Sequence, residues 1–175
     1  TPENRKEVGL VQSLSTADNL CMASLGPISL GGFISRRREQ PFIRRQIEDL
    51  HIKCGDPDLP VSSLSGGNQQ KVVLARELSR PLSLLLASQP TRGVDVGAIE
   101  FLHKRIVEER DVGTAVLIVS TELEEVESLA DRIAVMYRGR IVGIVGPDTP
   151  RDVLGLMMAG ISHEDAVATV EESHE

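Results

Sequence analysis

The sequence predicts an α/β fold in which a parallel sheet is combined with a helical subdomain. Apolar runs of strand length alternate with segments of helical periodicity over residues 81–160, and this alternation is typical of a parallel sheet. Residues 15–80 instead show helical periodicity broken by glycine and proline. The 175 residues suffice for one domain core, which Leu, Ile, Val and Ala must fill because the chain has three Phe, one Tyr and no Trp.

The first part of the chain is expected to be helical after a short loop. We predict a loop with an extended piece at residues 1–14, followed by a helix that Ser15 or Thr16 can cap. Glycine-containing pairs interrupt the helical pattern twice before it resumes over about residues 35–50. Two prolines then make residues 54–63 a loop.

The second part alternates strands with helices. An unbroken apolar run predicts a strand that is buried on both of its faces, and three further strands follow; the four ranges are 82–87, 114–119, 132–137 and 141–145. Between and after them we expect helices at 98–110, at 122–130 and from a cap at Thr149 to Gly160.

Composition excludes several classes of protein. A net charge of −7 and a lack of aromatic stacking residues argue against a general nucleic-acid binder. Arginines gather at Arg36–Arg38, Arg44 and Arg45, and we interpret them as a solvated helix face. Cys21 and Cys54 fit no metal or redox spacing, so we expect a reducing compartment and no metal site. No apolar run is long enough to span a bilayer.

The stretch Leu-Ser-Gly-Gly-Asn-Gln-Gln-Lys, which begins at Leu64, is the most informative part of the chain. Ser65 can cap a helix that starts with two glycines, and these let a ligand approach the N–H groups at the positive end of the helix dipole. The alternative is an ordinary Gly-Gly turn. The stretch resembles the signature motif of ATP-binding cassette (ABC) ATPases, in the sequence variant that is typical of sugar and nucleoside importers. The resemblance implies that ATP of a partner cassette is bound in trans by Ser65, Gly66, Gly67 and Asn68.

The run from Leu82 to Thr91 resembles the Walker B strand and its exit. The family usually has Asp where this chain has Ser88, and Glu where it has Gln89. That Asp holds Mg²⁺, and that Glu orients or deprotonates the attacking water. A serine hydroxyl brings no negative charge and a glutamine amide cannot accept a proton, so the resemblance implies a degenerate site. The alternative is that Ser88 and Gln89 are only a polar strand exit.

Further motifs occur in the family's order. Arg92-Gly93-Val94-Asp95 resembles the D-loop, in which Asp95 would lie at the cassette interface. Thr121 stands where the family has a switch histidine on the γ-phosphate, but a hydroxyl cannot carry imidazolium charge. Thr121 can also be a helix cap. Pro2-Glu3-Asn4-Arg5 resembles the Q-loop of C-terminal cassettes in tandem importers, which assigns Glu3 to that loop.

The resemblance implies an incomplete P-loop NTPase core. The sequence contains no phosphate-binding G-x-x-x-x-G-K-[ST] loop, which in the family precedes the Q-loop. We therefore expect the C-terminal part of a second cassette. Its expected regions are a Q-loop region at 1–14, a helical subdomain with the signature at 15–80, an α/β core with degenerate Walker B, D-loop and switch at 81–160, and a disordered acidic tail at 161–175.

The resemblance also implies a function. We expect the nucleotide-binding half of a sugar or nucleoside importer, at the cytoplasmic face of the membrane, whose signature serves ATP held by a partner cassette. Residues outside this chain would hold most of the ATP and Mg²⁺, so the chain alone is expected to be inactive. The implied partners are that cassette, permease subunits and, indirectly, a substrate-binding protein. The alternative is a non-catalytic half that binds nucleotide without turnover. A DNA-repair ATPase is disfavoured because residues 5–64 leave no room for a coiled coil.

Overall fold

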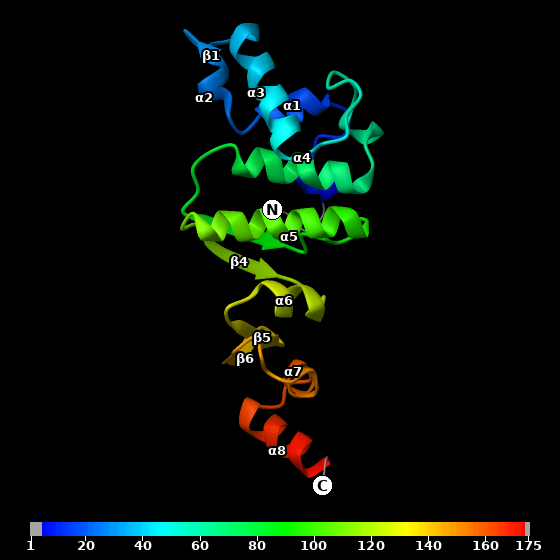
Figure 1. The fold of residues 1–175 in the computed structure, drawn as a ribbon, viewed down its shortest axis with the longest axis vertical. Helices are drawn as coiled ribbons and strands as arrows, with labels where there is room; N and C mark the ends of the chain where they lie inside the picture. The colour runs from blue at the N-terminus through cyan, green and yellow to red at the C-terminus, as the bar shows by residue number, and fades with distance from the viewer. Residues whose placement is uncertain (1–4, 174–175) are drawn as a thin grey trace. The chain divides into compact units, whose positions relative to one another are not determined.

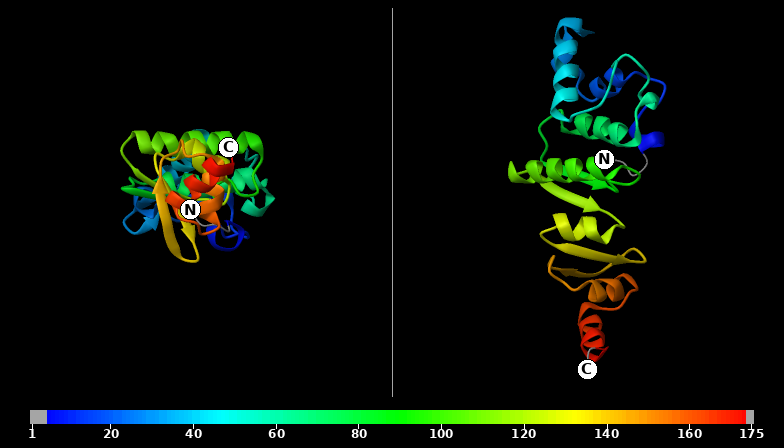
Figure 2. Two further views of the ribbon diagram at one scale, coloured as in Figure 1. Left: turned by 90° about the horizontal axis from the view of Figure 1, so that it is seen from below. Right: turned by 45° about the vertical axis from the view of Figure 1, so that its right-hand side comes forward.

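The computed structural model describes residues 5–173, which divide into two compact units between Val119 and Ser120. Figures 1 and 2 show the elements of each unit in chain order. Each unit has its own cluster of buried apolar side chains. Within the described part of the chain, no helix combines the length and the hydrophobicity that crossing a membrane requires.

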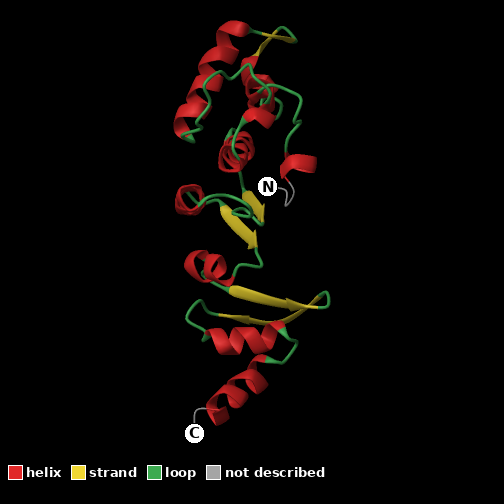
Figure 3. Cartoon of the chain, turned by 90° about the vertical axis from the view of Figure 1, so that its right-hand side faces the viewer, coloured by secondary structure: helices red, strands yellow, loops and turns green. Residues whose placement is uncertain are grey.

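The first unit is mostly helical (Figure 3). Its helical elements are the π-turn η1 (Arg5–Gly9), α1 (Thr16–Cys21), α2 (Leu25–Ile28), α3 (Arg36–Asp49), the 3-10 turn η2 (Val61–Ser63), α4 (Gly66–Leu78) and α5 (Val96–Asp111). Its strands are β1 (Ser29–Leu30), β2 (Phe33–Ile34), β3 (Leu84–Ser88) and β4 (Ala115–Val119). The turn η1 lies where the sequence predicts loop or extended chain.

Helix α4 runs through the core of the first unit. It packs against α1, α3 and α5, and because its neighbours lie on several sides, its consecutive residues 72–75 are all buried. Leu20 of α1 and Leu50, which follows α3, complete this core with exposures of 0% and 2%. The apolar run after the signature motif therefore forms the central helix of the unit.

The predicted glycine break before α3 is a two-residue hairpin turn. Strands β1 and β2 pair antiparallel, with Leu30 opposite Phe33. The two residues between them are Gly31 with φ of 60° and Gly32 with φ of 87°. Consecutive positive φ values match the right-handed twist of a tight hairpin, and glycine adopts them without a steric penalty.

The parallel sheet of the first unit consists of β3 and β4, which pair from Leu84 opposite Ala115 to the ends of both strands. The sequence predicts that the first of these strands is buried on both faces, and this prediction is wrong for one face. Leu85 is buried, whereas Leu84 and Leu86 are 54% and 47% exposed. Successive side chains of a strand point to opposite faces, and among the described residues only the face of Leu85 is covered.

The second unit combines an antiparallel strand pair with three helices: α6 (Leu123–Leu129), β5 (Ile133–Tyr137), β6 (Arg140–Val145), α7 (Arg151–Met158) and α8 (His163–Ser173). Helix α7 packs against β5, β6 and α8, and its Met157 is fully buried. The N-cap residue of α7 is Pro150 rather than the predicted Thr149, whose hydroxyl instead donates to the carbonyl of Gly146 at 2.9 Å.

The tail is folded where the sequence predicts disorder. Residues 163–173 form α8, and Ala166 is fully buried, with Val167 and Val170 packed beside it. These three residues recur at helical spacing, so one face of an otherwise acidic segment is apolar. The Ser162 hydroxyl also accepts a hydrogen bond from the backbone N–H of Asp165 at 3.2 Å. The acidic composition concealed this stripe.

Asn19 fixes the segment that leads into α1. Its side chain is fully buried. The Asn19 Oδ1 accepts from the Val11 N–H at 2.9 Å, and its Nδ2 donates to the carbonyls of Val11 at 3.1 Å and Ser15 at 2.9 Å. One amide therefore satisfies backbone groups on both sides of a turn.

We predict that Asn19→Leu lowers the free energy of unfolding by about 3 kcal/mol, because a side chain of similar shape leaves the part-buried N–H and carbonyl of Val11 without the Asn19 amide. Asp18→Ala, which removes only the exposed capping box of the same helix, is expected to lower it by about 1 kcal/mol. Urea unfolding measures both. Equal losses would contradict a special role for Asn19.

Candidate functional site

The predicted signature residues lie at the N-terminus of α4. Ser65 is the N-cap residue, with an extended backbone (φ −61°, ψ 158°), and it is exposed. Its hydroxyl oxygen accepts hydrogen bonds from the backbone N of Asn68 at 3.4 Å and from the Asn68 Nδ2 at 2.9 Å. The first N–H groups of an α-helix have no acceptor within the helix, and here those groups belong to Gly66 and Gly67. The helix end is thus suited to an anion.

Two side chains of α4 tie this helix end to the loops around it. The Asn68 Oδ1 accepts from the backbone N–H of Lys53 at 2.8 Å. The buried Gln69 donates through Nε2 to the carbonyl of Leu64 at 3.0 Å and to that of Val61 at 3.3 Å. The Gln69 side chain of α4 therefore holds Leu64, the residue immediately before the N-cap residue Ser65.

Lys71 links three parts of the unit. Its Nζ donates to the carbonyl of His51 at 3.1 Å and lies 4.4 Å from the centre of the Phe101 ring, on α5. The rings of His51 and Phe101 are themselves 5.5 Å apart. Burial, followed by the positive charge of Lys53, lowers the pKa of Lys71, while the Asp95 carboxylate acts in the opposite direction. A half-buried cation thus braces α4 against its neighbours.

Asp95 and Gly67 lie in contact. The Asp95 Oδ1 caps α5 by accepting from the backbone N of Ala98 at 3.0 Å. A Cβ atom on Gly67 would lie 2.8 Å from the Asp95 Oδ2 and 3.0 Å from the Ala98 Cβ. Packing alone therefore excludes a side chain at Gly67. The structure brings the predicted D-loop carboxylate to the predicted signature motif.

The exit of β3 carries no carboxylate. Ser88 and Gln89 are half-buried at the end of the strand, and the Gln89 N–H donates to the carbonyl of Val119 at 2.7 Å. Gln89 has a φ of 48°, which is unusual for a residue other than glycine. Across the part of the chain that the structure describes, no cluster of three His, Cys, Asp or Glu side chains could hold a metal ion.

Two predicted site residues lie elsewhere. Thr121 belongs to the second unit, where the N-cap residue of α6 is Glu122 and the Ser120 hydroxyl accepts from the Glu122 N–H at 3.0 Å. The interpretation of Thr121 as the helix cap is therefore wrong. Glu3 lies outside the described residues.

Sequence reasoning did not identify Lys53 or Phe101 as supports of the signature motif. Lys53 acts through its backbone N–H, which every residue except proline has, so no sequence signal could have found it. Phe101 lies in the second turn of α5 and contacts Lys71, the last residue of the stretch that begins at Leu64. An aromatic residue one turn into the next helix is a weak signal, because aromatic residues at such positions usually serve the core.

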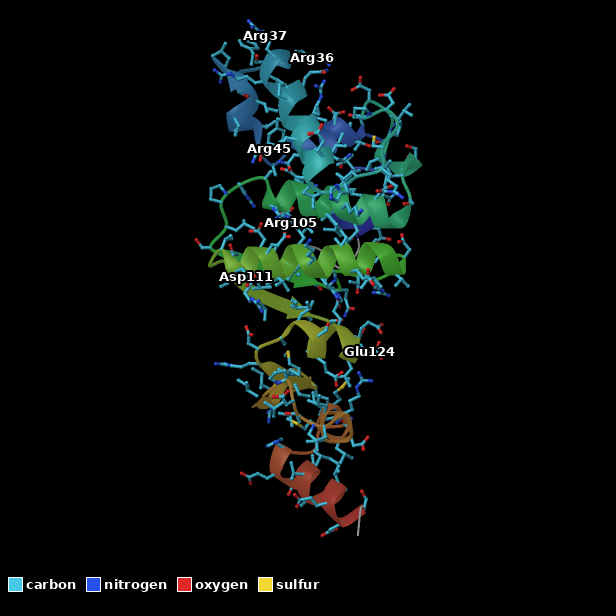
Figure 4. All side chains as sticks on the ribbon, in the orientation of Figure 1. Arg36, Arg37, Arg45, Arg105, Asp111 and Glu124 are labelled. Carbon is cyan, nitrogen blue, oxygen red and sulfur yellow. The ribbon has the colours of Figure 1, made fainter. Side chains whose placement is uncertain are left out.

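The arginine cluster lies on α3, which precedes α4 in the sequence. Figure 4 shows Arg36 and Arg37 at one end of this helix and Arg45 near the other. The side chains of Arg36 and Arg45 are 80% and 79% exposed and pair with acids of their own helix, Glu39 at 3.9 Å and Asp49 at 3.3 Å. These contacts agree with a solvated helix face.

Comparison with known proteins gives relatives along nearly the whole chain. No protein-family model matches the sequence. The nucleoside import ATP-binding protein NupA of Lactococcus lactis is 44% identical over 91% of the chain and 32% of NupA. The guanosine import ATP-binding protein NupO of Bacillus subtilis is 43% identical over 94% of the chain and 33% of NupO. The ribose import ATP-binding protein RbsA 2 of Rubrobacter xylanophilus is 40% identical over 98% of the chain. The chain spans about a third of the length of these relatives.

Solved structures agree on the fold. The dimeric post-hydrolysis state of the ATP-binding cassette MJ0796, bound to ADP and Pi, has a TM-score of 0.68 at 19% identity, over 83% of this chain and 62% of that one. MJ1267, an ATP-binding cassette of an ABC transporter, has a TM-score of 0.69 at 19% identity, over 91% and 66%. The predicted α/β cassette core with a helical subdomain is therefore confirmed.

We predict that Gly67→Ala destabilises the chain by about 1–3 kcal/mol, because its methyl group would overlap the carboxylate that caps α5. Gly97→Ala is the matched control, since its Cβ would meet only the Asp95 Oδ1 at an ordinary 3.6 Å. Urea midpoints measure both. If Gly67→Ala were no more harmful than Gly97→Ala, the contact between Gly67 and Asp95 would not constrain the site.

Proposed function

This chain is a homologue of the ATP-binding proteins of ABC sugar and nucleoside importers, and we propose from this premise that it supplies the signature motif of a cassette in trans. In this proposal, Ser65 and the backbone amides of Gly66 and Gly67 bind the γ-phosphate of ATP held by a partner cassette. ATP binding closes the pair of cassettes, and hydrolysis in the partner's site reopens it. The motion drives uptake of a nucleoside or sugar.

The observation that carries the proposal is the helix end at Ser65. An exposed hydroxyl and first-turn amides meet there at the positive end of a 13-residue helix. Such groups are fixed before the anion arrives, so little reorganisation accompanies binding. The buried middle of α4 and the braces at Asn68 and Gln69 maintain that geometry. The chain's contribution is thus electrostatic positioning.

The β3 exit does not fit a Mg²⁺ site. Mg²⁺ in nucleotide sites is held through carboxylates together with phosphate oxygens, and Ser88 and Gln89 offer only neutral groups. The Gln89 amide also cannot take a proton from an attacking water. We therefore place no metal-dependent step at this strand end, and we propose that the chain alone does not hydrolyse ATP.

The proposed partners follow from this division of roles. A second cassette would supply the phosphate-binding loop and the catalytic carboxylate, and a permease would dock at the cytoplasmic face of the membrane on the helical region of residues 15–60. A substrate-binding protein would act on the permease. The second candidate function is a non-catalytic half that binds nucleotide without turnover. The neutral side chains of Ser88, Gln89 and Thr121 favour that candidate.

The proposal is tested by Ser65→Arg in the reconstituted importer complex. We predict that ATP turnover falls by about 10²-fold or more, since removing one preformed donor costs about 10²–10³ and the bulky side chain obstructs the phosphate. Ser62→Arg adds the same side chain at an exposed position of η2 and should leave turnover near that of the unmodified protein. Unchanged turnover in Ser65→Arg would show that the signature motif is not part of the active site.

A second prediction concerns the degenerate positions. Ser88→Asp, Gln89→Glu and Thr121→His together should not raise turnover in a complex whose other ATP site is intact, because the restored side chains act only on ATP bound to their own cassette. ATPase rates are compared with and without the triple change. The comparison is repeated with the partner's catalytic carboxylate neutralised. A marked gain in the intact complex would show that this cassette's own ATP site limits transport.

A further inference from the structure

The cap of α4 leaves one hydroxyl proton free, and we propose that Asn68 is a positioning residue that makes the Ser65 hydroxyl an obligatory donor to phosphate. The inference rests on the proposed function, because it concerns the same site. It assigns Asn68 a role through Ser65 rather than a direct contact with nucleotide. Two serine caps in this chain, at Ser15 and at Ser65, use their hydroxyl groups differently.

The cap of α1 uses its serine hydroxyl completely. Ser15 Oγ accepts from the backbone N–H of Asp18 at 2.9 Å, and it donates its own proton to the Asp18 Oδ2 at 2.6 Å. The Asp18 carboxylate also accepts from the Ser15 N–H at 3.3 Å. This is a complete capping box. The Ser15 proton is directed back to its own helix and is not offered to solvent.

The cap of α4 has the same spacing with Asn68 in place of an acid. The Lys53 backbone N–H can only donate, so the amide atom 2.8 Å from it must be the oxygen of Asn68. The Asn68 NH₂ group is thereby turned toward Ser65, at 2.9 Å from its Oγ. An amide NH₂ has no acceptor to offer. The Lys53 N–H thus fixes the direction of the hydrogen bond between Asn68 and Ser65.

The consequence concerns the hydroxyl of Ser65. A hydroxyl has one proton and two acceptor lone pairs. The side chain and the backbone N–H of Asn68 occupy the acceptor side at 2.9 Å and 3.4 Å, so the proton is left to point outward from an exposed residue. Donation into the oxygen also polarises the O–H bond, which strengthens its bond to an anion. A phosphate oxygen, which only accepts, is the matching ligand.

The experiment is Asn68→Asp in the reconstituted importer complex. The carboxylate keeps the shape, still accepts from the Lys53 N–H and favours a helix N-terminus, so the melting temperature should not fall. Its second oxygen would take the Ser65 proton, as Asp18 takes that of Ser15. We expect ATP turnover to fall about tenfold to a hundredfold. This loss is smaller than the one expected for Ser65→Arg, which removes the donor and also adds a bulky side chain. The reverse exchange, Asp18→Asn, is the matched control and should not change turnover.

A double-mutant comparison separates the possible outcomes. If Asn68 acts through the hydroxyl, Asn68→Asp should cause no further loss of turnover in a Ser65→Ala background. An equal loss in that background would mean that Asn68 acts by its own contact or charge, and it would overturn the inference. Normal turnover in Asn68→Asp alone would also overturn it. Normal turnover in Ser65→Ala would instead contradict the proposed function.

Discussion

The burial of α4 is the constraint on which the rest of the first unit depends. Val72, Val73 and Ala75 are completely buried, and each buried valine contributes about 1.5–3 kcal/mol relative to an exposed one. The helix cannot slide or turn without exposing these side chains. Its first turn, at Ser65, is therefore fixed by apolar packing several residues away. A preformed donor site needs this separation, with a rigid buried body and an open, polar end.

Local signals in the sequence were sufficient for most elements of the first unit. The start of α4 follows from a serine before two glycines, and the break before α3 follows from Gly31-Gly32, because both depend on backbone preferences of a few residues. That the break is a hairpin of two short strands was not predicted. The predicted helix at 98–110 begins two residues earlier in the structure, at Val96, because Asp95 caps it. Helix α8 was missed because its burial depends on a stripe of apolar residues within an acidic segment.

The residues of the candidate site could be named from the sequence, and their roles stay predictions, whereas their arrangement could not be predicted. Gly67 and Asp95 were both named as site residues, yet their contact depends on how α4 and α5 pack. The role of Lys53 lies in its backbone, which leaves no trace in the sequence. Thr121 is part of the second unit, and motif order alone did not predict that division of the chain.

The backbone at the β3 exit keeps an unusual geometry although its side chains are neutral. A residue other than glycine in the left-handed region costs about 1–3 kcal/mol, and Gln89 adopts a φ of 48° there. The turn continues with the Arg92 N–H donating to the Gln89 carbonyl at 3.2 Å and leads directly to Asp95. Asp95 then caps α5 and contacts Gly67. The strained turn therefore leads the chain from the end of β3 to the residue that caps α5 and contacts Gly67.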